Sequence, residues 1–243
     1  MARIEDANPK NSSGGYNRTL GDPYLARLIQ KVQSTVIKNG NDLEMIIAES
    51  CEKKIENLDD FVKDCNRRNI SNGVYLCEKR VLRESENFKL KSHEPDFLVL
   101  ILCESDTAPR VCHIVELKDG SQFDTKKSKS EHERLEEYAI FLGPRIPFAV
   151  DFYICCFNEN DKDVIKTGLK NEFALDEILT GRDFCDLIGI DYESVVTKRK
   201  ESIKDNLLYF SSEAAKVSEI RSAVNNMNST VVYENDFYPT DDE

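Results

Sequence analysis

The sequence predicts an α/β protein in which a central mixed β-sheet is flanked by helices. One observation is the order of elements over residues 41–157, where a helical pattern precedes three apolar segments of strand length, a second helix and a fourth strand. Another is the segment 148–157 (FAVDFYICCF), which is almost wholly apolar, as expected of a strand buried on both faces of such a sheet. With 243 residues, 40% of them hydrophobic, the chain can bury a core of this kind.

We expect the chain to consist of a flexible arm, one domain and an acidic tail. Residues 1–20 are rich in Asn, Ser and Gly and have little apolar surface to offset the entropy of ordering. Residues 21–227 are predicted to form a single domain, with its core at about 41–157 and a helical C-terminal part. Residues 228–243 are acidic and are expected to be loose.

Apolar residues spaced by three and four positions predict the helices of this domain. They are expected over residues 23–40, with Gly40 as the stop, over 41–65, from Ser128 or Ser130 to 142, over 175–179 and 182–187, and within 192–227. Residues 180–191 are interpreted as a core connection rather than as part of a helix-turn-helix.

Apolar segments bounded by turn residues predict the strands. They are expected over residues 74–82, 96–103 and 110–117, which would form a β-meander, and over 148–157. This order of strands places the ends of the second and third strands side by side.

Composition narrows the functional class. A net charge of −12 argues against a protein that coats nucleic acid nonspecifically, although a local basic groove stays compatible with it. The eight cysteines show neither a C-x-x-C pair nor metal-ligand spacing, which predicts buried, reduced thiols. No apolar segment is long enough for a membrane span or a signal core, so we expect a soluble, cytoplasmic protein without a membrane partner.

Three charged residues are placed to meet at one end of the predicted sheet. Asp96 begins one strand, and Glu116 and Lys118 lie near the end of the next strand. Because hairpin strands lie side by side and side chains alternate with a period of two, Asp96 can lie beside Glu116, with Lys118 on the same face. The sequence therefore predicts a cluster of two carboxylates and one ammonium group.

Such a cluster fits metal-assisted chemistry on a phosphate. Two adjacent carboxylates repel each other unless a divalent cation lies between them, and oxygen ligands suit Mg²⁺. The cation would polarise the phosphate and bind the attacking water, while Lys118 contacts the water or neutralises developing charge. The carbonyl of Leu117 is expected to complete the ligand set with Asp96 and Glu116.

A further carboxylate is expected from the preceding helix. Glu44 lies near the start of an otherwise apolar helix, in GNDLEMIIAESC, where an unpaired carboxylate would be costly. Glu49 on the same helix is the reserve candidate, and the sequence does not separate the two.

The Pro-Asp pair at 95–96 and the Glu-Leu-Lys triplet at 116–118, preceded by a helix with Glu44, resemble the PD-(D/E)XK nuclease superfamily. Residues 41–157 match its αβββαβ core, so the resemblance implies a restriction-endonuclease-like fold. The stretch DGSQFDTKKSKSEHERL after the triplet resembles type II restriction endonucleases. The resemblance implies sequence-specific hydrolysis of phosphodiester bonds in double-stranded DNA, with Mg²⁺ required, Mn²⁺ as a substitute, and 5′-phosphate ends as products.

Several basic residues are candidates for DNA contacts. A patch at the start of the helix after the active-site strand is placed to contact a phosphate near the scissile bond. It consists of Lys126, Lys127 and Lys129. The candidates for base contacts are Arg67 and Arg68, within residues 66–72, and residues 198–200.

A palindromic DNA site calls for two active sites, so a homodimer is expected, with the first helix or the C-terminal helix as interface. A monomer that cuts each strand in turn is the alternative assembly. Two other functions stay open: a DNA repair or junction-resolving nuclease of the same superfamily, and a non-catalytic module that binds nucleic acid or a protein.

Overall fold

The computed structural model describes residues 1–9, 14–91, 93–103 and 110–228. Within them the elements are, in chain order, α1 (Gly14–Leu20), α2 (Pro23–Ser50), α3 (Leu58–Asn66), β1 (Gly73–Glu78), α4 (Lys79–Glu84), β2 (Phe97–Leu102), β3 (Val111–Lys118), α5 (Thr125–Leu142), η1 (Gly143–Arg145), β4 (Ala149–Cys156), α6 (Lys162–Gly168), η2 (Leu175–Glu177), β5 (Ile178–Thr180), α7 (Gly181–Ile188), α8 (Tyr192–Lys200), α9 (Ile203–Ala214) and α10 (Ser218–Asn228).

The chain groups into two compact units. Among the described residues, one unit lies within 40–199 and contains the β-sheet, and the other combines those of 1–39 with residues 200–228. One domain is predicted from the sequence over residues 21–227, and the unit boundaries fall inside that span.

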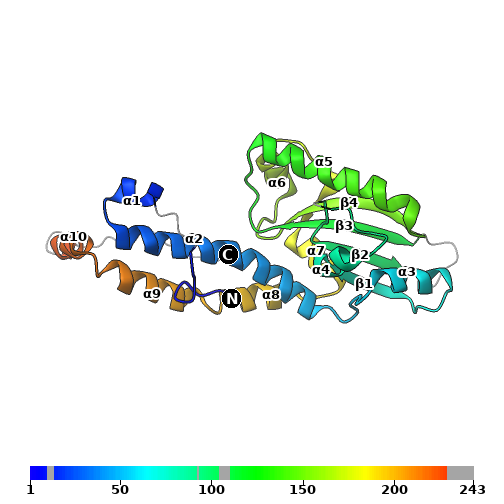
Figure 1. Ribbon diagram of the computed structural model, residues 1–243, viewed down its shortest axis with the longest axis horizontal. Coiled ribbons are helices and arrows are strands. Elements are labelled where there is room, and N and C mark those ends of the chain that lie inside the picture. The colour runs from blue at the N-terminus through cyan, green and yellow to red at the C-terminus, as the bar shows by residue number, and fades with distance from the viewer. Residues whose placement is uncertain (10–13, 92, 104–109, 229–243) are drawn as a thin grey trace, which may run out of the picture. The chain divides into compact units, whose positions relative to one another are not determined.

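The sheet has five strands in the order β1-β2-β3-β4-β5. The first three strands pair antiparallel as a meander, whereas β4 pairs parallel to β3 and β5 pairs parallel to β4. The predicted α/β class with a central mixed sheet is therefore confirmed. The parallel pairing needs a crossover connection between β3 and β4, and α5 supplies it (Figure 1).

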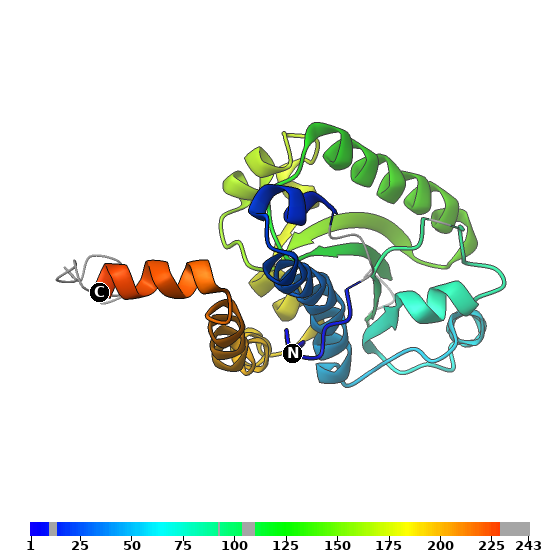
Figure 2. The ribbon, with the colours of Figure 1, turned by 60° about the vertical axis from the view of Figure 1, so that its left-hand side comes forward.

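Helices cover both faces of this sheet. On one face, Leu98 of β2 and Ile114 of β3 form a core with Tyr138 of α5, and residues of α3 join the same core. Both views show α5, drawn in green, running along the sheet (Figure 1 and Figure 2). On the opposite face α7 packs by its Phe184 ring, whose centroid lies 5.8 Å from that of Phe97.

In the helical unit, α2 packs against α9. Leu28 of α2, Ala214 of α9 and Ile4 are buried together. The Ile4 amide donates a hydrogen bond of 2.8 Å to the Asn206 side chain. This differs from the mobile arm expected over residues 1–20, because burial of Ile4 and this hydrogen bond offset ordering entropy, and because α1 forms within the same stretch. Residues 10–13 lie outside the described part.

Gly40 does not end the first helix, so this prediction is wrong. A glycine costs a helix only about 1 kcal/mol relative to alanine, and α2 continues past it to Ser50. The predicted helix over residues 41–65 is instead interrupted after Ser50. There the Ile55 amide donates to the Leu76 carbonyl, so the chain runs beside β1 until α3 begins.

The end of β1 and the start of α5 also differ from the predicted boundaries. The strand expected over residues 74–82 ends at Glu78, because α4 turns Val81 and Leu82 into the core. The helix expected from Ser128 or Ser130 begins earlier, at Thr125, where the Asp124 carboxylate accepts a hydrogen bond from a main-chain amide. The helix expected over residues 175–179 is wrong, because the 3-10 turn η2 covers only 175–177 and β5 begins at Ile178. The sequence pattern did not predict α6, and residues 192–227 contain the separate helices α8, α9 and α10.

The strands at 96–103, 110–117 and 148–157 are confirmed as β2, β3 and β4, although β4 is fully buried only toward its C-terminal end. Residues 180–191 include the cap of α7 directly after β5, in agreement with a core connection. All eight cysteines are free thiols; seven are buried and Cys103 is exposed. No helix in the described residues is long and apolar enough to cross a membrane, and residues 229–243 of the expected tail lie outside the described part.

Candidate active site

Asp96 and Glu116 meet at one end of the sheet. Phe97 of β2 pairs with Val115 of β3, so one further step along each strand brings Asp96 opposite Glu116. Both side chains are buried, with 5% of Asp96 and 3% of Glu116 exposed. The structure therefore brings together the two carboxylates that the sequence predicted as neighbours.

Asp96 has a partner for each of its carboxylate oxygens. The Lys79 ammonium lies 2.7 Å from Oδ1, and the Leu117 amide donates a hydrogen bond of 2.9 Å to Oδ2. Lys79 is the first residue of α4, and the β1–β2 register places it opposite Asp96. Leu117, which was expected to offer its carbonyl oxygen to a cation, contacts Asp96 through its amide.

Glu116 belongs to a network of alternating charges with Lys118 and two residues of α5. Its Oε1 lies 2.7 Å from the Lys118 Nζ and 2.6 Å from Nη2 of Arg134. The Glu131 carboxylate contacts the same two cations, Lys118 at 3.0 Å and Arg134 at 2.5 Å. Glu116 and Lys118 point to the same face of the sheet, as their spacing predicted, and this is the face that α5 covers.

Glu44 lies at the edge of a hollow that reaches Asp96. This hollow has a volume of about 550 Å³ and is lined by α2, α4 and the adjoining strand ends, with Lys79, Arg80 and Arg83 as its basic residues. Glu49, the reserve candidate, is exposed and does not line the hollow. Of the two glutamates on this helix, Glu44 is thus the one that the fold brings to the site.

The carboxylates of the site differ in their pKa. Burial and then the neighbouring charge of Asp96 raise the pKa of Glu44 from 4.5 to about 7. Burial and then Glu116 also raise the pKa of Asp96. For Glu116, burial acts in the same direction, but Lys118 and Arg134 outweigh it and hold the pKa below its ordinary value.

The Lys118 ammonium stays protonated. Burial acts to lower its pKa, but the Glu116 and Glu131 carboxylates outweigh burial and raise the pKa above its ordinary value. In this state Lys118 can donate hydrogen bonds and neutralise negative charge.

The donor set fits a hard divalent cation. Oε2 of Glu116 is buried without a hydrogen-bond partner among the described residues, and such an orphaned oxygen beside a second carboxylate matches what Mg²⁺ requires. Among the described residues, no three His, Cys, Asp or Glu side chains form a metal-binding group by themselves. The predicted ligand set has only two carboxylates, Asp96 and Glu116, and a carbonyl oxygen.

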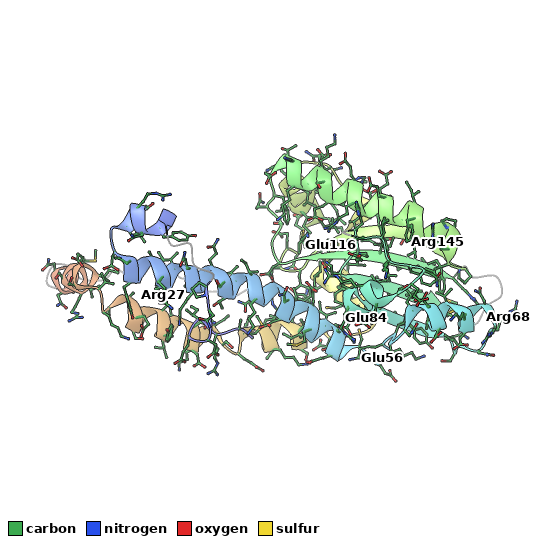
Figure 3. The ribbon with its side chains drawn as sticks, in the orientation of Figure 1. Arg27, Glu56, Arg68, Glu84, Glu116 and Arg145 are labelled. Carbon is green, nitrogen blue, oxygen red and sulfur yellow. The ribbon has the colours of Figure 1, made fainter. Side chains whose placement is uncertain are left out.

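The predicted DNA contacts lie at different distances from this site. Lys126, Lys127 and Lys129 are exposed in the first turns of α5, near the end that carries Glu131. Arg67 and Arg68 follow α3, at the opposite end of β1 from Glu78. Figure 3 accordingly shows Arg68 well apart from Glu116. Residues 198–200 form the end of α8.

Three further charged residues of the site, Lys79, Glu131 and Arg134, were not predicted from the sequence. Lys79 was hidden because residues 74–82 were taken as one strand. The sequence did contain a signal for the other two. Glu131 lies three residues after the buried Ser128, and Arg134 directly precedes the buried Leu135, so both lie toward the inward face of α5. A charged residue on such a face needs a partner, and the charged end of β3 supplies it.

The sequence is similar to that of a characterised restriction enzyme. The chain is 42% identical over 228 residues to the type II restriction enzyme HhaII of Haemophilus parahaemolyticus, covering 92% of this chain and 98% of that enzyme. No family model matches the sequence.

Proposed function

The chain belongs to the family of the type II restriction enzyme HhaII, and we propose that it is itself a site-specific deoxyribonuclease that hydrolyses phosphodiester bonds in double-stranded DNA. The observation that carries the proposal is the meeting of Asp96, Glu116 and Lys118 at one end of the sheet in a chain of this family. The products would carry 5′-phosphate ends.

We further propose that the active site is of the PD-(D/E)XK type within a restriction-endonuclease-like fold. The Pro-Asp pair at 95–96 and the Glu-x-Lys triplet at 116–118 support this assignment. The order α2, β1, β2, β3, α5, β4 supports it as well, although the short α3 and α4 are inserted into the αβββαβ pattern.

Each residue of the site has a role in this proposal. Asp96 and Glu116, with the Leu117 carbonyl, would hold Mg²⁺, for which Mn²⁺ could substitute, and Glu44 would add a carboxylate from α2. When bound there, such a cation would supply Lewis-acid polarisation of the phosphate and would lower the pKa of the attacking water. Lys118, kept protonated by its neighbours, donates to the water or to a phosphate oxygen and neutralises the charge that develops there.

The hollow beside Asp96 suggests where the DNA backbone lies. Arg80 and Arg83 are exposed at its rim, three residues apart on α4, and side chains at this spacing are neighbours, about 5–6 Å apart at Cβ. Phosphates next to the scissile one can therefore meet α4. We keep Lys126, Lys127 and Lys129 as phosphate contacts and Arg67 and Arg68 as candidates for contacts further away.

We also propose that the enzyme is a homodimer, because a palindromic site presents two scissile bonds related by a two-fold axis. We propose the cytoplasm as its location, because that is where its proposed DNA substrate would be met. The exposed apolar residues of α9, Ile203, Leu207 and Leu208, which are 58–63% exposed, are the candidate interface. Sedimentation of the wild type against a Leu207→Ser/Leu208→Ser variant tests it, since the variant should sediment as a monomer.

The experiment that tests the function is digestion of a large phage DNA with and without Mg²⁺, beside a Glu116→Ala variant. We expect discrete fragments that require both the metal and Glu116, and sequencing of the fragment ends should return one short sequence with 5′-phosphates. A smear of fragments, or intact DNA across several DNAs and metals, would contradict the proposal.

A further inference from the structure

The network around Glu116 contains one carboxylate that the proposed reaction does not use. Glu131 lies on α5 with its side chain 13% exposed, 3.0 Å from the Lys118 ammonium and 2.5 Å from the Arg134 guanidinium. Oε1 of Glu116 contacts the same two cations. Lys118 and Arg134 are therefore each held between two carboxylates, one on β3 and one on α5.

The charges of the site suggest why a second carboxylate is needed. A divalent cation that binds Glu116 repels Lys118 and Arg134, which share Oε1 of the same carboxylate. With Glu116 as their only anchor, these two cations would either block the metal or be displaced by it. Removing a partner from a buried ion pair is also costly, because the remaining charge stays buried.

We propose that Glu131 is a positioning residue that keeps Lys118 and Arg134 beside Glu116 when a divalent cation takes over that carboxylate. The proposal rests on the function proposed above. It concerns Glu131, which is not among the residues proposed to bind the metal or activate the water. Glu131 acts through Lys118 and is not itself placed on the substrate.

Charge counting supports the arrangement. Glu44, Asp96, Glu116 and Glu131 carry four negative charges when ionised, and Lys79, Lys118 and Arg134 carry three positive charges, which leaves −1. A divalent cation changes this balance to +1, which matches the single negative charge of one phosphodiester. Without Glu131 the loaded site would carry +2 and would bind the metal less well.

Three variants test the proposal: Glu131→Gln, Glu131→Asp, and the double variant Glu131→Gln/Arg134→Gln. We expect Glu131→Gln to raise the half-saturating Mg²⁺ concentration about tenfold, equivalent to about 1.4 kcal/mol. Calorimetric titration of Mg²⁺ without DNA measures this independently of cleavage. The double variant removes one charge of each sign, so it should recover most of the Mg²⁺ affinity.

The cleavage rate at saturating Mg²⁺ separates the effect of the position of the residue 131 carboxylate from the effect of its charge. Glu131→Asp keeps the charge but shortens the reach to Lys118, so we expect near-normal Mg²⁺ binding with a reduced kcat. The double variant should also have a reduced kcat, because Lys118 has lost its second anchor. Glu133→Gln is the matched control, since Glu133 pairs with Lys129 at 3.8 Å on the exposed side of the same helix.

The outcomes are distinct. If Glu131→Gln binds Mg²⁺ and cleaves DNA like the wild type, with only a lower melting temperature, Glu131 merely ties α5 to β3 and the inference is overturned. If the wild type cleaves no DNA, the proposed function fails instead, and the Mg²⁺ titrations still decide whether Glu131 controls metal binding.

Discussion

Replacement of Glu44 by glutamine should stabilise the metal-free protein, and only at neutral to alkaline pH. The pKa of Glu44 rises from 4.5 to about 7 because burial and Asp96 disfavour its charge. An acid whose pKa is raised on folding is protonated in the folded chain while already ionised in the unfolded chain, so stability falls as pH increases from 4.5 to 7. Above pH 7 the full cost is present, and Glu44→Gln removes it.

The size of this effect follows from the shift. A shift of this size corresponds to about 3 kcal/mol without screening, but Glu44 is only partly buried, and solvent screening reduces the expected gain to about 1–2 kcal/mol. For a chain of this length, 1 kcal/mol changes the melting temperature by about 2–4 °C.

Urea unfolding of Glu44→Gln in EDTA at pH 5 and pH 8 measures the gain. Glu49→Gln is the control, because Glu49 is exposed on the same helix. We expect a gain at pH 8 that is much smaller at pH 5, no gain for Glu49→Gln, and a smaller difference at pH 8 once Mg²⁺ is added. A gain of equal size at both pH values, or the same gain for Glu49→Gln, would refute the reasoning.

Two further predictions concern packing and DNA contact. Gly181→Ala should lower the free energy of unfolding by about 1–3 kcal/mol, because a Cβ there would lie 2.3 Å from the Phe157 carbonyl oxygen. Urea unfolding measures this loss, with Gly120→Ala as the control, because a Cβ at Gly120 would meet open space. A loss for Gly181→Ala no larger than that for Gly120→Ala would contradict the prediction. Arg83→Gln should reduce the slope of log affinity against log salt by about 0.9 for DNA bound in Ca²⁺, the value for one phosphate contact. Arg145→Gln is the control, because Arg145 lies away from Glu116, beyond the far end of α5 (Figure 3), and its slope should equal that of the wild type. An unchanged slope for Arg83→Gln would show that α4 does not contact the DNA.

The sheet and the central carboxylates could be predicted from the sequence because they depend on local pattern. Apolar segments bounded by turn residues located β2 and β3, and the two-residue period put Glu116 and Lys118 on one face. Glu44 was identified from its place in an apolar helix, but only the fold separated it from Glu49.

The helix end near Gly40 and the other charged residues of the site were not predicted. The site residues depend on contacts between parts of the chain that are distant in sequence. The helix end was misplaced at Gly40, because a glycine costs a helix only about 1 kcal/mol relative to alanine and α2 continues past it to Ser50. Lys79 is a residue of the site only because β1 ends at Glu78 and α4 begins there. The pairing of Arg134 with Glu116, and of Glu131 with Lys118, requires α5 to pack beside β3, and no spacing within α5 reveals these partners.

The central claim is that Asp96, Glu116 and Lys118 together form the centre that cuts DNA. Single-turnover cleavage of a short duplex carrying the mapped site tests it most directly, with Asp96→Asn, Glu116→Gln and Lys118→Met beside Glu133→Gln as the control. Binding of the same duplex in Ca²⁺ shows that each variant still recognises DNA. We predict that the three variants bind the duplex but cleave it at least about 10²-fold more slowly, while Glu133→Gln cleaves at the wild-type rate. Wild-type cleavage by any of the three would contradict the account.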